Sequence, residues 1–279
     1  MADRLKFALF GLHWLQNTDP GTLLRQAQFA EEVGFEALWV GDHIALPAEA
    51  EDQPRLEAVV ALTYLAAATK QVRLGAGVIV LPQRQPVLLA KQLSSIDILS
   101  HGRLTVGVGV GHVKEELHAL GVPFAERGRR TDEYISAMLT LWKESSPSFA
   151  GHFVSFAGVV EHPRPIQHPY PPLIIGGQGP SAYRRAIQVG NGWYGWELDV
   201  EQTAQALAEL REVAGRYERP PELGELEISI TPPGIVTAET ARQYAEIGVH
   251  RLVVQPSTMD GAAMDDLIRS VAETLIGHI

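Results

Sequence analysis

The chain has 279 residues, of which 46% are hydrophobic, and a formal net charge of −10. This length permits a single α/β barrel, and the negative charge argues against a nucleic-acid-binding surface, which needs clustered lysine and arginine. The absence of cysteine excludes disulfides, thiolate catalysis and iron–sulfur clusters. No signal-like apolar region and no run of about 18 apolar residues occurs, so we expect a cytoplasmic protein without a membrane partner.

Short apolar runs alternate with longer segments of helical spacing along the chain. Such runs are typical of parallel strands that are buried on both faces. The predicted strands lie near residues 6–12, 37–43, 72–81, 103–110, 171–177, 192–194, 226–230 and 251–255. The predicted helices cover residues 21–33, 57–69, 86–99, 129–144, 182–189, 200–216, 237–247 and 260–276. Eight β–α units in this length predict one domain over residues 1–279, a (β/α)8 TIM barrel.

Residues 146–171 interrupt this alternation between the fourth and fifth strands. The segment contains an aromatic run typical of a hairpin and then five prolines between positions 163 and 172. We interpret it as an irregular excursion over the barrel and not as a separate domain.

The second predicted strand ends in two polar residues, Asp42 and His43. In a barrel of this type, functional groups lie at the carboxyl ends of the strands and in the loops that follow. An imidazole exchanges protons near neutral pH, which makes His43 a candidate catalytic residue. Alternatively, Asp42 caps a turn and His43 only hydrogen-bonds to it.

The third and fourth predicted strands contain glycines. Gly75 and Gly77 predict a bulge or a close backbone approach, with tight packing in a barrel layer as the alternative. The stretch RLTVGVGVGH (103–112) lacks the G-x-G-x-x-G spacing and does not open a helix, which disfavours a dinucleotide-binding fingerprint. Alternation of glycine and valine leaves one strand face bare, against which a flat ring or a helix would lie.

A glycine-rich segment, Gly176-Gly177-Gln178-Gly179-Pro180-Ser181-Ala182, follows the fifth strand. Backbone N–H groups at a helix N-terminus bind phosphate well, and proline suits the first helical turn. The segment therefore predicts a phosphate site, with an ordinary βα loop as the alternative. The histidines show no H-x-x-x-H or H-E-x-x-H pair, so we expect no metal site.

Together these strand ends resemble the bacterial luciferase-like monooxygenase superfamily, and most closely its branch of oxidoreductases that use the deazaflavin coenzyme F420. The resemblance extends over nearly the whole chain. It is carried by LWVGDHI (38–44), LGAGVIVLPQRQPVLLAKQLSSIDILSHGRLTVGVGVGHVKEEL (74–117), GVPFAERGRRTDEY (121–134), PPLIIGGQGPSAYRRA (171–186) and GNGW (190–193).

The resemblance implies that the coenzyme lies across the carboxyl-terminal face of the barrel. Asp42 and His43 would meet the deazaflavin ring, with His43 as proton donor. A non-proline cis peptide at Gly77–Val78 would form a bulge behind the ring, which the glycines of residues 103–112 would allow to approach. The remaining coenzyme contacts would be Val80, Val110, Gly111, His112 and Glu115 along its length, and Gly177, Gln178, Gly179, Ser181 and Ala182 around its phosphate.

One departure concerns His112. The sugar-phosphate dehydrogenases of this branch carry a glutamate base at the matching position. The histidine argues against their reaction and suggests a wall residue of the site.

We therefore expect hydride transfer between coenzyme F420 and an unidentified small organic substrate. Trp14 and Trp193 would line the substrate pocket, although these tryptophans, like Tyr194 and Trp196, could equally be packing residues. The alternatives are an FMN-dependent monooxygenase of the same superfamily and a non-catalytic flavin-binding homologue. The resemblance also implies a homodimer.

Overall fold

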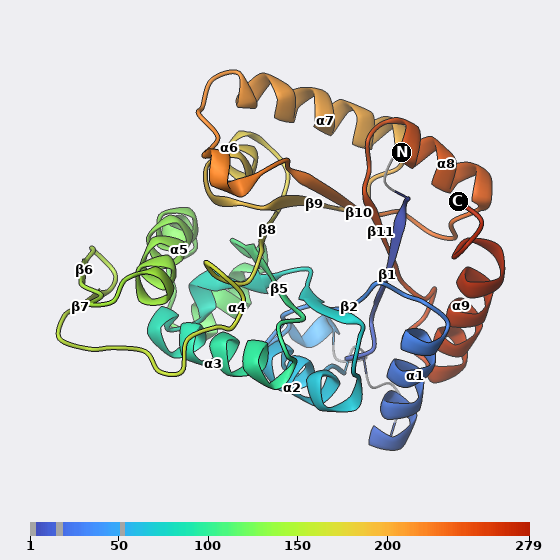
Figure 1. Ribbon diagram of the computed structural model, residues 1–279, viewed down its shortest axis with the longest axis horizontal. Helices are drawn as coiled ribbons and strands as arrows, with labels where there is room; N and C mark the ends of the chain where they lie inside the picture. Colours follow the sequence, from blue (N-terminus) through green and yellow to red (C-terminus); the bar gives the residue numbers. More distant parts are fainter. Residues whose placement is uncertain (1–3, 15–18, 51–53) are drawn as a thin grey trace.

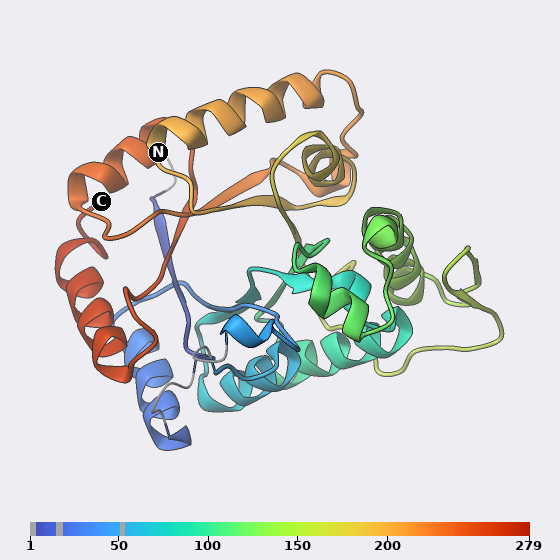
Figure 2. The same ribbon diagram turned by 180° about the vertical axis from the view of Figure 1, so that it is seen from behind.

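The computed structural model describes residues 4–14, 19–50 and 54–279 (Figures 1 and 2). Within these ranges, eight parallel strands pair in a closed ring, in the order β1–β2–β3–β5–β8–β9–β10–β11 and back to β1. The ring consists of β1 (Lys6–Phe10), β2 (Ala37–Val40), β3 (Arg73–Ala76), β5 (Leu104–Gly109), β8 (Leu173–Gly176), β9 (Gly192–Trp196), β10 (Glu227–Thr231) and β11 (Arg251–Val254). The predicted (β/α)8 barrel is confirmed.

Helices follow the strands and form an outer layer around the barrel (Figures 1 and 2). They are α1 (Pro20–Glu32), α2 (Ala58–Ala68), α3 (Pro86–Leu99), α5 (Arg127–Lys143), α6 (Pro180–Val189), α7 (Val200–Ala214), α8 (Ala238–Glu246) and α9 (Gly261–Thr274). A short helix that the sequence pattern did not predict, α4 (Lys114–Ala119), follows β5. In the described part of the chain, no helix is both long enough and apolar enough to cross a membrane.

The predicted strand 72–81 is broken at the cis peptide between Gly77 and Val78, and it continues as β4 (Ile79–Val80). This confirms the predicted bulge. A Cβ atom on Gly107 would lie 1.7 Å from the carbonyl oxygen of Ala76, and one on Gly109 would lie 2.5 Å from Val78 Cγ2. The bare face of β5 is therefore filled by the bulge, and the expectation that these glycines admit a planar ring is wrong.

The strands pack against apolar residues on both faces. One group fills the barrel interior and includes Phe10, Trp39 and Tyr194, whereas the larger group lies between the strands and the helices. At the amino-terminal end of the strands, the buried Arg251 pairs with Glu36 at 2.8 Å and Glu227 at 2.9 Å. These contacts close the base of the barrel and leave its carboxyl-terminal end for the site.

The excursion contains the expected hairpin, formed by β6 (Phe149–Ala150) and β7 (Ser155–Phe156). The hairpin projects beyond α5, away from the barrel (Figure 1). The later part returns along α3, where Asp97 Oδ2 accepts the backbone N–H groups of Ile166 and Gln167 at 2.8 and 3.0 Å. The excursion therefore lies on the outer wall, and the expectation that it passes over the barrel is wrong.

Candidate active site

His43 lies just after β2, and its side chain is 21% exposed. Its Nδ1 atom is 3.0 Å from Oε2 of Glu116, a buried residue of α4. The other carboxylate oxygen accepts the backbone N–H groups of Ile44 and Ala45. Burial alone would raise the pKa of Glu116, but the hydrogen bonds from His43 and Ile44 outweigh it and hold the pKa below its ordinary value. An ionised carboxylate therefore faces one side of the His43 ring.

Asp42 is enclosed by protein. Its Oδ2 atom accepts the N–H of Val80 and the Nε–H of Arg84, each at 3.0 Å, and Arg84 also forms an ion pair with Glu57. Burial raises the pKa of Asp42, and the contacts with Arg84 and Val80 only partly offset this effect. The carboxylate fastens the end of β2 to β4. It is not available to meet a ring, which corrects the role that the resemblance implied.

The loop after β5 reaches the same strand ends. The exposed His112 lies with its ring centroid 5.9 Å from that of His43, at an interplanar angle of 88°. A Cβ atom on Gly111 would lie 2.6 Å from Val80 Cγ1, so the half-buried Val110–Gly111 segment packs beside β4. The predicted residues of β2, β4 and the β5 loop therefore converge.

The acidic residue that reaches His43 is not the one expected. Glu115 is exposed on α4, whereas its neighbour Glu116 is buried and bonded. Sequence reasoning missed Glu116, and the only signal was its position beside the apolar Leu117 in HVKEEL.

His13, which follows β1, supports the same loop. Its Nε2 atom accepts the backbone N–H of Gly41 at 3.1 Å, and the side chain is fully buried. Burial lowers the pKa of His13 to about 3, so the ring is neutral and its proton is on Nδ1. No motif in the sequence pointed to this contact, which orients the backbone immediately before Asp42.

The glycine-rich segment after β8 turns into α6. Gly177 and Gly179 have φ values of +114° and +95°, in the left-handed region that favours glycine. No side chain caps the helix, and a Cβ atom on Gly179 would meet nothing within 4 Å. Uncapped N–H groups beside open space fit a phosphate group.

The other predicted phosphate contacts differ in exposure. Gln178 and Ser181 are exposed, whereas Ala182 is buried and can offer only its backbone. Arg184 and Arg185 both pair with Asp132, with contacts of 3.0 and 2.5 Å. These arginines tie α6 to α5.

The aromatic candidates separate into two groups. Trp193 is fully buried and donates from Nε1 to the carbonyl oxygen of Gly177 at 2.8 Å, so it is a packing residue that supports the phosphate loop and not a pocket wall. Trp14 and the exposed Trp196 both contact Phe10, at centroid distances of 5.4 and 5.1 Å. These two tryptophans therefore gather at the carboxyl-terminal ends of β1 and β9.

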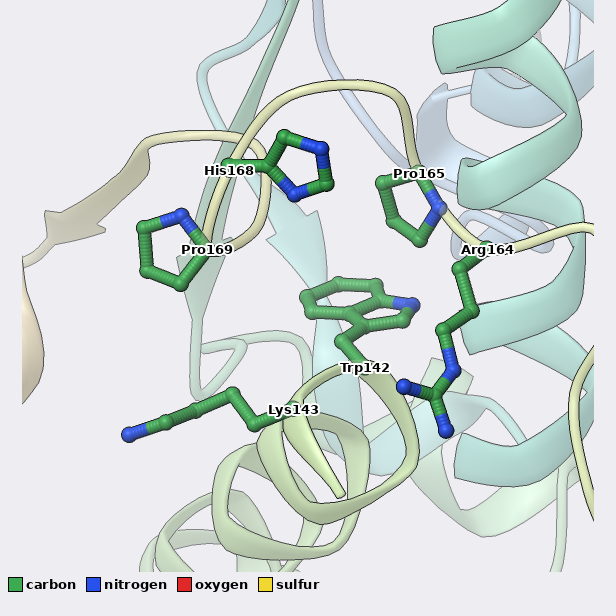
Figure 3. Close-up of a pocket in the computed structure, with 6 residues that line it drawn as sticks. All are labelled: Trp142, Lys143, Arg164, Pro165, His168 and Pro169. Carbon is green, nitrogen blue, oxygen red and sulfur yellow. The ribbon is translucent and has the colours of Figure 1, made fainter. Parts of the chain in front are cut away.

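A separate hollow of about 520 Å³ lies between the end of α5 and the excursion. Figure 3 shows Trp142 at its centre with Lys143, Arg164 and His168 around it. Trp142 donates from Nε1 to Ser94 Oγ at 3.0 Å, and Arg164 donates to the carbonyl oxygen of Glu144. Because α5 runs antiparallel to the strands, this hollow lies far from the strand ends that carry His43.

Comparison with known proteins adds three findings. The model of the luciferase-like monooxygenase family matches residues 7–267. An uncharacterised protein of Mycobacterium tuberculosis (strain H37Rv) is 32% identical over 91% of this chain and 94% of its own length. The oxygenase component of a flavin-dependent trigonelline monooxygenase from Acinetobacter baylyi is 31% identical over 67% of this chain, which spans only 52% of that relative.

A solved structure, an F420-dependent secondary alcohol dehydrogenase in complex with an F420–acetone adduct, has a TM-score of 0.80. It covers 98% of both chains at 18% identity, which shows a common fold.

Proposed function

The chain belongs to the luciferase-like monooxygenase family, and on this premise we propose that it is an F420-dependent oxidoreductase acting on a small organic substrate. The observation that carries the proposal is the His43–Glu116 pair. A partly exposed imidazole, held by a buried carboxylate at the strand ends, is suited to proton transfer. Hydride transfer to or from a substrate that also gains or loses a proton needs such a group.

The residues present fit a deazaflavin coenzyme at its phosphate end. Gly177 and Gly179 give a loop without side chains, and the start of α6 offers N–H groups that no side chain caps. At the ring end, the Val78 side chain turns toward Gly109 and Gly176, which leaves the Gly77–Val78 peptide for a ligand. Val80, Val110, Gly111, His112 and Glu115 would extend this surface.

When bound, the deazaflavin would supply hydride chemistry at its ring. His43 would give a proton to the substrate or take one from it, because an imidazole does both near neutral pH. Trp14 and Trp196 would hold the apolar part of the substrate. Asp42 and His13 would keep the His43 loop in place without touching either reactant.

The alternative is an FMN-dependent monooxygenase, and the similarity to a flavin-dependent trigonelline monooxygenase favours a flavin in this site. Both coenzymes carry a phosphate that the Gly177–Ala182 loop could hold, so this loop does not separate them. Parallel fluorescence titrations of purified protein with F420 and FMN separate them directly. Binding of F420 alone would support the proposal, and a preference for FMN would replace it with the monooxygenase. Tight binding without turnover of any substrate would indicate a non-catalytic homologue.

A homodimer is part of the proposal. The α2 segment AVVALTYLAAA has no charged residue, yet its Val60, Thr63, Tyr64 and Ala67 side chains are exposed. A helix face of this kind is typical of an interface. We expect Tyr64→Glu to shift the mass measured by light scattering from dimer to monomer, and a monomeric wild type would contradict this.

A further inference from the structure

We propose that Glu116 is a positioning residue that fixes the tautomer of His43, with the proton on Nδ1 and the lone pair on Nε2. Proton exchange with the substrate would then run only through Nε2. The kinetic consequence rests on the proposed function, whereas the tautomer is a property of this chain alone.

The two carboxylate oxygens of Glu116 have different hydrogen-bond partners, and this difference assigns the tautomer of His43. One oxygen accepts from the backbone N–H groups of Ile44 and Ala45, which can only donate. The other oxygen lies 3.0 Å from Nδ1 of His43. An ionised carboxylate only accepts hydrogen bonds, so this contact is a bond only if Nδ1 carries the proton. The same pairing holds metal-bound and catalytic histidines in one orientation in other proteins.

The surrounding charges favour the ionised carboxylate. Glu116 is only 2% exposed, and the positive charge of Arg55 lies close enough to interact with it. His112, on the loop after β5, meets the His43 ring edge to face. His13, on the loop after β1, is near enough to His43 for the two rings to interact electrostatically, and His13 is itself neutral.

The tautomer determines which nitrogen of His43 exchanges a proton with the substrate. A substrate that is oxidised loses a hydride from carbon to the coenzyme and a proton from an adjacent O–H or N–H group. This O–H or N–H bond of the substrate breaks, and a new N–H bond forms at Nε2 of His43. The resulting imidazolium is stabilised by Glu116, and in the opposite direction the same proton returns from Nε2 to the substrate.

Glu116→Gln tests the inference because glutamine has a single acceptor oxygen. That oxygen is needed by Ile44 and Ala45, so the amide NH2 group must face Nδ1 of His43. Two donors cannot face each other, and the ring proton is expected to move to Nε2. Nitrogen-15 NMR of the cofactor-free protein distinguishes the two tautomers. We expect a protonated Nδ1 in the wild type and a protonated Nε2 in the variant.

The kinetic arm uses protein loaded with coenzyme and substrate. Glu116→Gln should lower kcat by roughly 10²- to 10⁴-fold, the range for losing correctly placed acid–base catalysis or the correct tautomer. Coenzyme affinity should not change, and adding the substitution to His43→Ala should cost nothing further. Lys114→Gln, at an exposed position of the same helix, is the matched control and should match the wild type in both arms.

The outcomes separate this inference from the proposed function. A wild-type spectrum with the proton on Nε2 would overturn the inference, and it would do so even if the variant failed to fold. An unchanged tautomer in a folded Glu116→Gln protein would overturn it as well. Failure of the wild type to bind F420 would refute the proposed function and leave the tautomer result standing.

Discussion

Replacing His13 with glutamine is expected to make folding less sensitive to acid. The imidazole is fully buried behind Gly41, and burial lowers the pKa of His13 to about 3. In the unfolded chain the same ring titrates near 6.5. Between these two values the unfolded chain binds more protons than the folded one, so the stability of the fold rises with pH in this window. The stabilisation is complete above pH 6.5, the pKa of this ring in the unfolded chain, and it is lost as the pH falls toward about 3, its pKa in the folded protein.

The magnitude follows from the size of this shift. The change from 6.5 to about 3 corresponds to about 5 kcal/mol of unfolding free energy when the whole window is crossed. Integration over the accessible part, from about pH 7 to about pH 5, gives a loss of about 2 kcal/mol from this one residue. Other titrating groups contribute equally to wild type and variant, so the difference between them isolates His13.

Urea denaturation at the two pH values measures the effect. The side-chain oxygen of glutamine can take the position of Nε2 and accept the N–H of Gly41 without titrating. His13→Gln should therefore lose about 2 kcal/mol less than the wild type on acidification. His118→Gln, at an exposed position of α4, is the control and should lose as much as the wild type. Equal losses in all three proteins would refute the assignment of acid sensitivity to the buried His13.

Three further outcomes are expected from the site and its scaffold. His43→Ala should lower turnover by about 10²-fold or more while coenzyme binding is retained, and an unchanged rate would remove His43 from the mechanism. Gly179→Val should weaken F420 and FMN binding together, because φ is +95° and the side chain would enter the phosphate space; unchanged titrations would place the phosphate elsewhere. Gly109→Ala should destabilise the fold by about 1–3 kcal/mol, because its Cβ would lie 2.5 Å from Val78 Cγ2, and Val78→Ala should relieve much of this in thermal denaturation of the double variant.

The barrel could be predicted because its signals are local. Uninterrupted apolar runs indicate strands buried on both faces, and helical spacing between them indicates the outer layer. Glycine also gave correct local signals: the strand breaks at the cis peptide after Gly77, and at Gly75 a Cβ atom would lie 2.4 Å from Trp39 Nε1, which fits the alternative of tight packing in a barrel layer. The excursion was recognised by its prolines, but its position was not, because that position depends on hydrogen bonds that the backbone of the excursion donates to Asp97 on α3.

The candidate site was predicted in part for the same reason. His43 and the Gly177–Gly179 loop follow directly from their places at strand ends. The sequence left Trp193 as either a pocket residue or a packing residue, and the structure shows the second, because its side of β9 faces Tyr183 of α6 at a centroid distance of 5.6 Å. One strand position decides between the barrel interior and the helix layer, because side chains alternate between the two faces.

The sequence by itself determined the kind of fold, the order of its strand ends and the residue types available there. Only the tertiary structure decided which of two adjacent glutamates meets His43, because that contact joins residues 73 positions apart and depends on how α4 is seated. It also decided that the bare face of β5 receives Val78 and not a ligand ring. Periodicity specifies which face of an element is buried, whereas the partner on that face is set by packing between elements distant in the chain.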